Sequence, residues 1–167
     1  MDTLAIFGLQ LVMSLILCSL LAKWFLAPWL KEKTQSQALF WLSLPHATRY
    51  VGMVFLVPGV VSPSLPGSFA TLAAYGDLVA GVLAVLVLIA LRSRWAGTMA
   101  LVWLFNIVGT ADLLNALSHA EAVPHLGAAW YIPTFWVPVL LVTHFMMFAR
   151  LLKKPTEQGT ESALART

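Results

Sequence analysis

Three ionisable residues interrupt long apolar stretches of this sequence. The chain has 167 residues, of which ten are Lys or Arg and seven are Asp or Glu, yet only Arg49, Asp77 and Asp112 lie well inside apolar segments. A charge in hydrocarbon costs roughly 2.5 to 3.5 kcal/mol or more, so it is usually paired or lines a wet cavity. The two carboxylates and the guanidinium could hold a proton, a cation or a basic ligand. The alternative is a structural network of ion pairs and hydrogen bonds that binds nothing.

Small residues accompany both carboxylates in the sequence. Asp77 lies between Ala73 and Gly81 at a spacing of four, and Asp112 follows Gly109 at a spacing of three. Residues three or four apart share one face of a helix, and small residues on that face let another helix approach closely. We therefore expect both carboxylates to face protein and not lipid.

Further polar side chains lie along the segment that contains Asp112. Asn115 and His119 follow it at i+3 and i+7 on one helix face, whereas Asn106 and Thr110 lie on another side. Two polar faces predict a helix packed centrally. The residues expected to form a ligand-binding pocket, with Arg49 as the counter-charge of the two acids, are Arg49, Asp77, Asn106, Thr110, Asp112 and Asn115.

Two histidines are expected at matched depths nearer the cytoplasm. His46 and His144 each lie roughly 10 Å from the inner end of an apolar segment, at about 1.5 Å per helical residue. Two facing imidazoles could ligate a b-type haem. Binding of a proton or an anionic headgroup next to Arg49 is a comparable alternative, and so is a plain hydrogen bond from each ring to a neighbouring group.

A polar connection contains a third set of candidate ligands. His119, Glu121 and His125 could offer nitrogen and oxygen donors to a zinc or copper ion, with Asp112 as a further donor. Their spacing matches no compact metal-binding motif. The alternative is an ordinary exposed loop.

The composition predicts an integral membrane protein. Apolar residues make up 60% of the chain and charged residues 10%, whereas an ordinary soluble domain has roughly 25% charged residues. Crossing ~30 Å of hydrocarbon takes about 20 helical residues. We expect an all-α, five-transmembrane-helix antiparallel bundle in residues 1–154, followed by a disordered polar cytoplasmic tail at 155–167. The expected spans are 4–25, 38–61, 69–91, 96–117 and 128–152.

The basic residues predict how the bundle is oriented. Lys and Arg near the ends of spans are retained on the cytoplasmic side, and here they flank the first and third connections and follow the last span, but are absent from the second and fourth. The N-terminus is then outside and the C-terminus cytoplasmic, in a multi-pass protein of a bacterial inner membrane. The net charge of +3 is a topology signal. No basic stripe with exposed aromatic residues indicates nucleic-acid binding.

The depth of Arg49 depends on residues 38–44. If this apolar stretch starts the second span, Arg49 lies near the midplane. If it lies along the cytoplasmic surface before Pro45, Arg49 is close enough to reach water with its side chain.

No motif in the sequence names a substrate or a reaction, so whether the protein is an enzyme stays open. The favoured function is binding or translocation of a small ligand, proton or cation in an intramembrane polar pocket. The alternatives are a membrane-embedded enzyme or b-haem electron carrier that uses His46 and His144, and a non-catalytic accessory subunit of a membrane complex. Besides the lipid bilayer, the expected partners are a small ligand or ion and either further copies of the chain or a membrane partner subunit.

Overall fold

Every regular element in the described part of the chain is a helix. The computed structural model describes residues 1–153, so the predicted tail at 155–167 lies outside the described residues. The elements are α1 (Thr3–Leu21), η1 (Ala22–Leu26), α2 (Ala27–Lys31), α3 (Gln35–Ser43), η2 (Leu44–Leu56), α4 (Gly67–Ser93), α5 (Thr98–Leu117), η3 (Ala120–His125), η4 (Gly127–Trp130), η5 (Ile132–Trp136) and α6 (Val137–Leu151).

Four continuous helical stretches are long and apolar enough to cross a membrane. Within the described residues they are Thr3–Lys31, Gly67–Ser93, Thr98–Leu117 and Gly127–Leu151. They coincide with four of the predicted spans, so the predictions of an all-helical fold and of four apolar segments long enough to span a membrane are confirmed. The remaining predicted span, 38–61, is not among them because it divides into α3 and the 3-10 helix η2.

The 3-10 helix η2 places a line of residues inside the protein. It begins at Leu44, next to Pro45, whose nitrogen has no hydrogen to donate, and it continues for 13 residues. A 3-10 helix has three residues per turn, so side chains at i and i+3 lie one above the other. The buried residues of η2 are His46, Arg49, Gly52 and Phe55, which follow this spacing. In an α-helix the first and last of them would lie on opposite sides.

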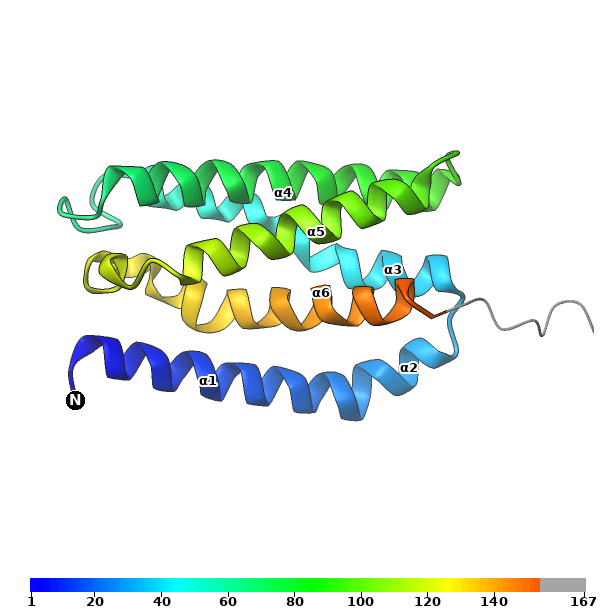
Figure 1. Cartoon of the computed structure of the whole chain (residues 1–167), viewed down its shortest axis with the longest axis horizontal. Helices are drawn as coiled ribbons and strands as arrows, with labels where there is room; N and C mark the ends of the chain where they lie inside the picture. Colours follow the sequence, from blue (N-terminus) through cyan, green and yellow to red (C-terminus); the bar gives the residue numbers. More distant parts are fainter. Residues whose placement is uncertain (154–167) are drawn as a thin grey trace, which may run out of the picture.

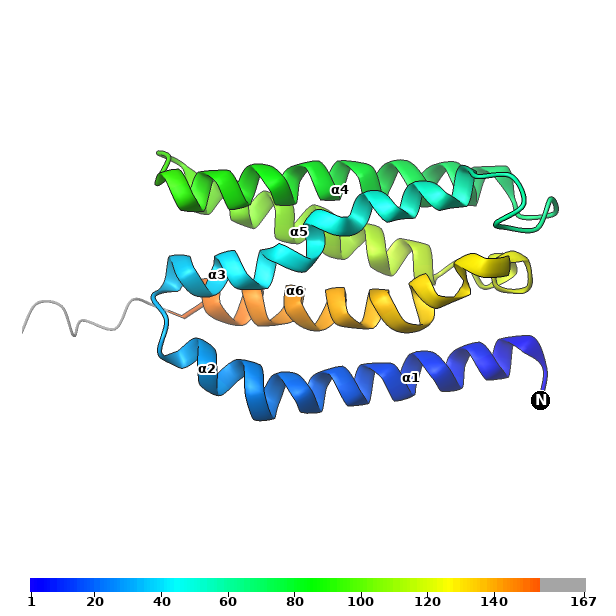
Figure 2. The same ribbon diagram turned by 180° about the vertical axis from the view of Figure 1, so that it is seen from behind.

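The long helices lie side by side along one axis (Figures 1 and 2). In Figure 1 the N-terminus lies at the same end of the molecule as the connections 57–66 and 118–126. The connections 32–34 and 94–97 lie at the opposite end. Helix α3 packs against α4 and α6 and then continues into η2, which packs along α4. The chain therefore enters the bundle at α3, and Arg49 is buried inside it.

Two apolar clusters occupy opposite ends of the interior. One contains Phe7, Phe55 and Phe69 near the end with the N-terminus. The other contains Leu39 and Phe105 nearer the opposite end, among residues of α3, α4, α5 and α6. Arg49, Asp77 and Asp112 belong to neither cluster. Along the chain, Arg49 lies between Leu39 of the second cluster and Phe55 of the first, so the buried charges lie between the two clusters.

Glycines allow η2 and α4 to approach closely, as the small residues around Asp77 predict. A Cβ atom added to Gly52 would lie 2.6 Å from both Cβ and Cγ of Asp77. A Cβ atom added to Gly81 would lie 3.3 Å from the backbone nitrogen of Tyr50 and 3.6 Å from Cβ of Arg49. The short distance between η2 and α4 is thus possible because Gly52 and Gly81 have no side chain.

We predict that Gly52→Ala lowers the free energy of unfolding by about 1 to 3 kcal/mol, because an added methyl group forces well-packed elements apart. The matched control is Gly8→Ala in α1, where nothing lies within 4 Å of the added Cβ. That change should be neutral or stabilising by up to about 1 kcal/mol, since Ala has the higher helix propensity. Unfolding in detergent micelles, followed by circular dichroism, measures both. Equal stability of Gly52→Ala and Gly8→Ala would show that η2 and α4 are not in close contact.

Candidate intramembrane polar site

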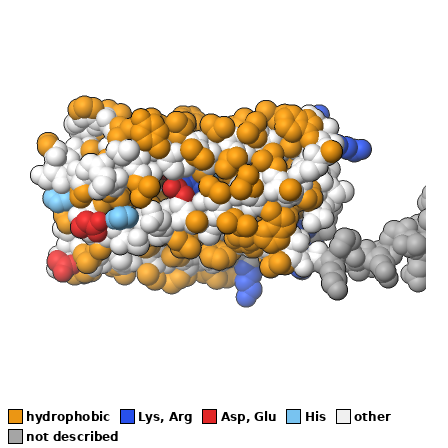
Figure 3. All heavy atoms as spheres, turned by 45° about the horizontal axis from the view of Figure 1, so that its top comes forward, with side chains coloured by type: hydrophobic (Ala, Val, Ile, Leu, Met, Phe, Trp, Pro, Cys, Tyr) orange, Lys and Arg blue, Asp and Glu red, His pale blue; other side chains and the backbone are white. Residues whose placement is uncertain are grey.

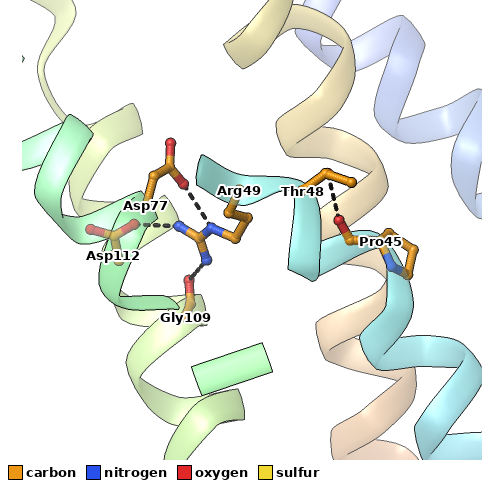
Figure 4. A network of polar contacts seen from close by, with 6 residues as sticks. All are labelled: Pro45, Thr48, Arg49, Asp77, Gly109 and Asp112. Carbon is orange, nitrogen blue, oxygen red and sulfur yellow. Dashed lines mark hydrogen bonds and ion pairs between the residues drawn. The ribbon is translucent and has the colours of Figure 1, made fainter. Parts of the chain in front are cut away.

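Arg49 joins three helical elements through its guanidinium group (Figure 4). Its Nε donates to Oδ1 of Asp77 on α4 at 2.7 Å, and its Nη2 donates to Oδ2 of Asp112 on α5. Its Nη1 donates to the carbonyl oxygen of Gly109 at 3.1 Å. The prediction that the three intramembrane charges meet across the interior is confirmed by these contacts.

The cluster of Arg49, Asp77 and Asp112 is buried but not fully closed. The side chain of Arg49 is 0% exposed, whereas those of Asp77 and Asp112 are 12% and 15% exposed. Figure 3 shows acidic and basic atoms together at mid-length, surrounded by hydrophobic side chains. Two carboxylates and one guanidinium carry one net negative charge when all are ionised. The excess charge is negative, and the two side chains that keep some exposure to solvent are the two carboxylates, Asp77 and Asp112.

Glycine positions also bring α5 to its neighbours. A Cβ atom added to Gly76 on α4 would overlap the carboxylate of Asp112. A Cβ atom added to Gly109 would lie 2.7 Å from Nε2 of His144 and 3.1 Å from Nη1 of Arg49. Gly76 and Gly109 thus let the acid on α5, the base on η2 and the histidine on α6 lie close together.

A small cavity borders the two carboxylates. It is lined by Asp77 and Asp112 together with Phe7, Phe55 and Phe69, and by residues of the 118–126 connection and η5. The space open to the centre of a water-sized sphere is ≈ 40 Å³. One water needs roughly 10 to 15 Å³ by the same measure, so the cavity has room for a few small species.

His46 and His144 lie in direct contact on the other side of Arg49. Their ring centroids are 4.0 Å apart, and the ring of Phe105 packs against both at 5.2 and 5.3 Å. Nε2 of His46 lies 2.9 Å from Oγ1 of Thr143, and Nδ1 of His144 lies 2.6 Å from Oδ1 of Asn106. Both rings are fully buried. The expected matching depth of the two histidines is confirmed.

This packing leaves no room for a haem between the two histidines. A haem with two axial histidines needs its macrocycle between the rings, but these rings touch one another at 4.0 Å. The predicted haem-ligating arrangement of His46 and His144 is therefore not the one in the structure. The plainer alternative, a hydrogen bond from each ring to a neighbouring side chain, is the one observed.

Three residues predicted for the acid pocket lie elsewhere. Asn106 contacts His144 through both its oxygen and its nitrogen, the latter donating to the backbone carbonyl at 3.3 Å. Thr110 donates to the backbone carbonyl of Asn106 at 2.6 Å. Asn115 is exposed. Asn115 lies one helical turn after Asp112, as the periodicity predicts. Because Asp112 itself is only partly buried, the next residue on the same helix face can be exposed.

The predicted metal-binding trio is not assembled. Nδ1 of His119 lies 2.7 Å from Oε1 of Glu121, and the His119 ring packs against Phe69. Glu121 and His125 are four residues apart in the 3-10 helix η3, which turns their side chains about 120° from each other. Within residues 1–153 no three His, Cys, Asp or Glu side chains form a group that could hold a metal ion.

Sequence reasoning did not find Gly76, Phe105 or Thr143. Thr143 directly precedes His144 in the sequence. This position does not indicate that the Thr143 hydroxyl contacts His46, which lies on a different helix. Gly76 directly precedes Asp77, and a glycine beside a buried acid is the one signal that could have indicated a close helix crossing. Phe105 has no sequence signal that separates it from any other apolar residue.

A family model for a domain of unknown function, DUF8737, matches residues 6–152. The chain belongs to this family. The match to DUF8737 extends from the first turn of α1 to the end of α6 and includes Arg49, Asp77, Asp112 and both buried histidines. No curated protein and no solved structure matches the chain.

We predict that Arg49→Met lowers the free energy of unfolding by about 3 to 5 kcal/mol, because it leaves two buried carboxylates without their cation. The combined change Arg49→Met, Asp77→Asn and Asp112→Asn should recover most of this loss, since it removes all three charges. Arg92→Met, at an exposed position, serves as the control and should change stability by less than about 0.5 kcal/mol. Thermal unfolding in micelles tests this, and wild-type stability of Arg49→Met would rule out a structural role for the ion pairs.

We predict a local pH effect in the 118–126 connection. The hydrogen bond from His119, together with a backbone hydrogen bond, holds the pKa of Glu121 below its usual value. Because the pKa is lowered on folding, the stabilisation is present above the pKa of the unfolded chain and is lost as the pH falls through the folded value. Carboxyl ¹³C NMR should show the Glu121 midpoint moving up in His119→Gln. His125→Gln should leave the midpoint unchanged, and an unchanged midpoint in His119→Gln would mean that the pair does not form in solution.

Proposed function

We propose that this protein is a multi-pass membrane protein that binds a proton, or another small cation, in a polar pocket inside the bilayer. The observation that carries the proposal is the charge balance of the Arg49 cluster. One guanidinium faces two carboxylates, and the side chains that keep some exposure are the two carboxylates.

Charge counting favours uptake of one positive charge. A buried ion pair is tolerated when its charges are matched, but an excess charge in a low-dielectric interior is costly. One proton or one monovalent cation brings the cluster from a net charge of −1 to zero. Asp77 and Asp112 are the acidic anchors of this ion, and Arg49 is the counter-charge that keeps both acids in the bundle when the site is empty.

The cavity supports a small ligand. Its lining combines the two acids with apolar and aromatic side chains. The space of ≈ 40 Å³ suits a proton carried on water or a compact cation better than a large organic molecule. The cavity lies toward the end of the molecule that contains the N-terminus, so we propose that the ion reaches Asp77 and Asp112 from that side.

We propose five spans, with α3 and η2 together forming the second. At about 1.5 Å per α-helical residue and about 2.0 Å per 3-10 residue, the nine residues of α3 and the 13 of η2 have a combined length of about 40 Å. That exceeds the ~30 Å of hydrocarbon in a bilayer. The length of α3 and η2 together thus supports a membrane crossing by this segment, although neither helix alone is long enough to indicate one.

The distribution of charge supports an orientation with the N-terminus outside. Apart from the charged atoms at mid-length, Lys and Arg lie toward one end of the molecule in Figure 3, and Asp, Glu and His toward the other. Retention of basic residues on the cytoplasmic side then gives a cytoplasmic C-terminus. We propose a bacterial inner membrane as the location. The apolar outer surface of α1 is compatible with lipid, with further copies of the chain or with a partner subunit.

The proposal predicts that wild-type protein in lipid nanodiscs takes up one proton at a buried carboxyl group. Infrared difference spectra between neutral and acidic pH should show the C=O stretch of a protonated acid. Asp77→Asn and Asp112→Asn should each abolish this band, because either change already makes the cluster neutral. Glu121→Gln and Asp2→Asn, at exposed positions, should leave it in place. If a cation other than the proton binds, added Na⁺ or K⁺ should suppress the band.

Two outcomes would contradict the proposal. The first is the absence of a protonated carboxyl band at every pH at which the protein stays folded, both with and without added Na⁺ and K⁺. The second is a band that survives both Asp77→Asn and Asp112→Asn. Either result would leave the charged cluster with a structural role.

A further inference from the structure

We propose that His46 and His144 form a second proton-binding site at the inner end of the same polar network. This inference rests on the proposed function, since it concerns where a proton taken up by the network can reside. Each ring has one nitrogen without a hydrogen-bond partner, Nδ1 of His46 and Nε2 of His144, and both rings are 0% exposed.

The hydrogen bonds around His46 determine which of its nitrogens is free to accept a proton. Oγ1 of Thr143 lies 3.1 Å from the carbonyl oxygen of Val139 and 2.9 Å from that of Leu140, and it donates its single hydrogen to this backbone pair. Oγ1 can then only accept from Nε2 of His46, at 2.9 Å. A neutral imidazole with its hydrogen on Nε2 has a lone pair on Nδ1. That lone pair is the unpartnered group.

The same reasoning applies to His144. The side-chain nitrogen of Asn106 donates to the carbonyl oxygen of His144 at 3.3 Å, so Oδ1 of Asn106 is the atom that faces Nδ1 at 2.6 Å. An amide oxygen only accepts, and Nδ1 of His144 therefore carries the hydrogen. The free lone pair lies on Nε2. Two neighbouring elements thus hold two imidazoles in different tautomers, each with a lone pair in a buried space.

The packing limits what the two lone pairs can bind. The rings are in contact, and Phe105 covers both. A proton is the one ligand that requires no added volume, and the negative charge of the acid cluster has to offset the positive charge that the proton brings into this buried space. Proton binding to Nε2 of His144 forms one N–H bond and turns a neutral imidazole into an imidazolium ion, with no other bond changed.

The pair is coupled to the acid cluster across Gly109. Because a Cβ atom there would lie 2.7 Å from Nε2 of His144 and 3.1 Å from Nη1 of Arg49, no side chain separates the two groups. The charged group that faces the pair across Gly109 is Arg49 on η2. Asp77 on α4 and Asp112 on α5 are linked to the pair through the Arg49 guanidinium. Among residues 1–153, α3 has no charged residue, and the one charged residue of α6, Arg150, lies in its last turn. A proton that leaves a carboxyl group of the cluster and binds the imidazole keeps the network neutral.

The test is ¹⁵N NMR of histidine side chains in the full-length protein in lipid bilayers. The chain has four histidines, and His46→Gln and His144→Gln assign the two buried signals. At neutral pH and above we expect the Nε2–H tautomer for His46 and the Nδ1–H tautomer for His144. On acidification, one of these rings should become doubly protonated. In Asp112→Asn, which removes a negative charge from the network, the imidazolium population at the same pH should fall about tenfold or more. Glu121→Gln should have no such effect.

The outcomes separate this inference from the proposed function. If the infrared carboxyl band forms but both buried imidazoles stay neutral over the whole folded pH range, the histidine site is wrong and the acid site stands. If an imidazolium ion forms but its population does not depend on Asp112, the two sites are not coupled and the inference fails. If neither the carboxyl nor the imidazole signal changes, both proposals fail. The wild-type spectrum decides these cases even where a variant does not fold.

Discussion

The packing of the helices depends on one buried interaction, the guanidinium of Arg49 between two carboxylates. Arg49 has to reach acids on two different helices and a backbone carbonyl at once. This is only achieved where η2, α4 and α5 come closer than ordinary side chains allow. The glycines at 52, 76, 81 and 109 therefore belong to the charge network as much as the charged residues do. Their role is to let polar atoms meet where water is scarce.

The meeting of Arg49, Asp77 and Asp112 could be predicted because the energetic penalty of a lone charge in hydrocarbon is large compared with any packing preference. The similar depth of His46 and His144 could be predicted from their distances to the ends of the apolar segments, whereas the contact between their rings could not. Four long helices could be predicted because their apolar segments are long and uninterrupted. In each case one strong physical term decides the outcome, and no knowledge of the neighbouring elements is needed.

Where several weak terms compete, the sequence was a poor guide. Asn106 and Asn115 have the same side chain and lie on the same helix, yet one is buried against His144 and the other is exposed. A single amide can be satisfied by protein or by water at similar free energy, so only the tertiary contacts decide. The helix type of residues 44–56 was also missed. The spacing of His46, Arg49, Gly52 and Phe55 fits a three-residue repeat, but 3-10 helices of this length are uncommon.

That helix links the length of one segment to the position of one charge. If residues 44–56 adopted α-helical geometry, the segment would shorten by about 6 Å, at about 0.5 Å per residue, and would wind by a different angle at every step. Arg49 would then rotate away from the line that it shares with Gly52 and Phe55, and its distance from both acids would grow. The ion pairs with Asp77 and Asp112 therefore favour the longer 3-10 form of residues 44–56 over an α-helix. A change in the charge of either acid would weaken this preference.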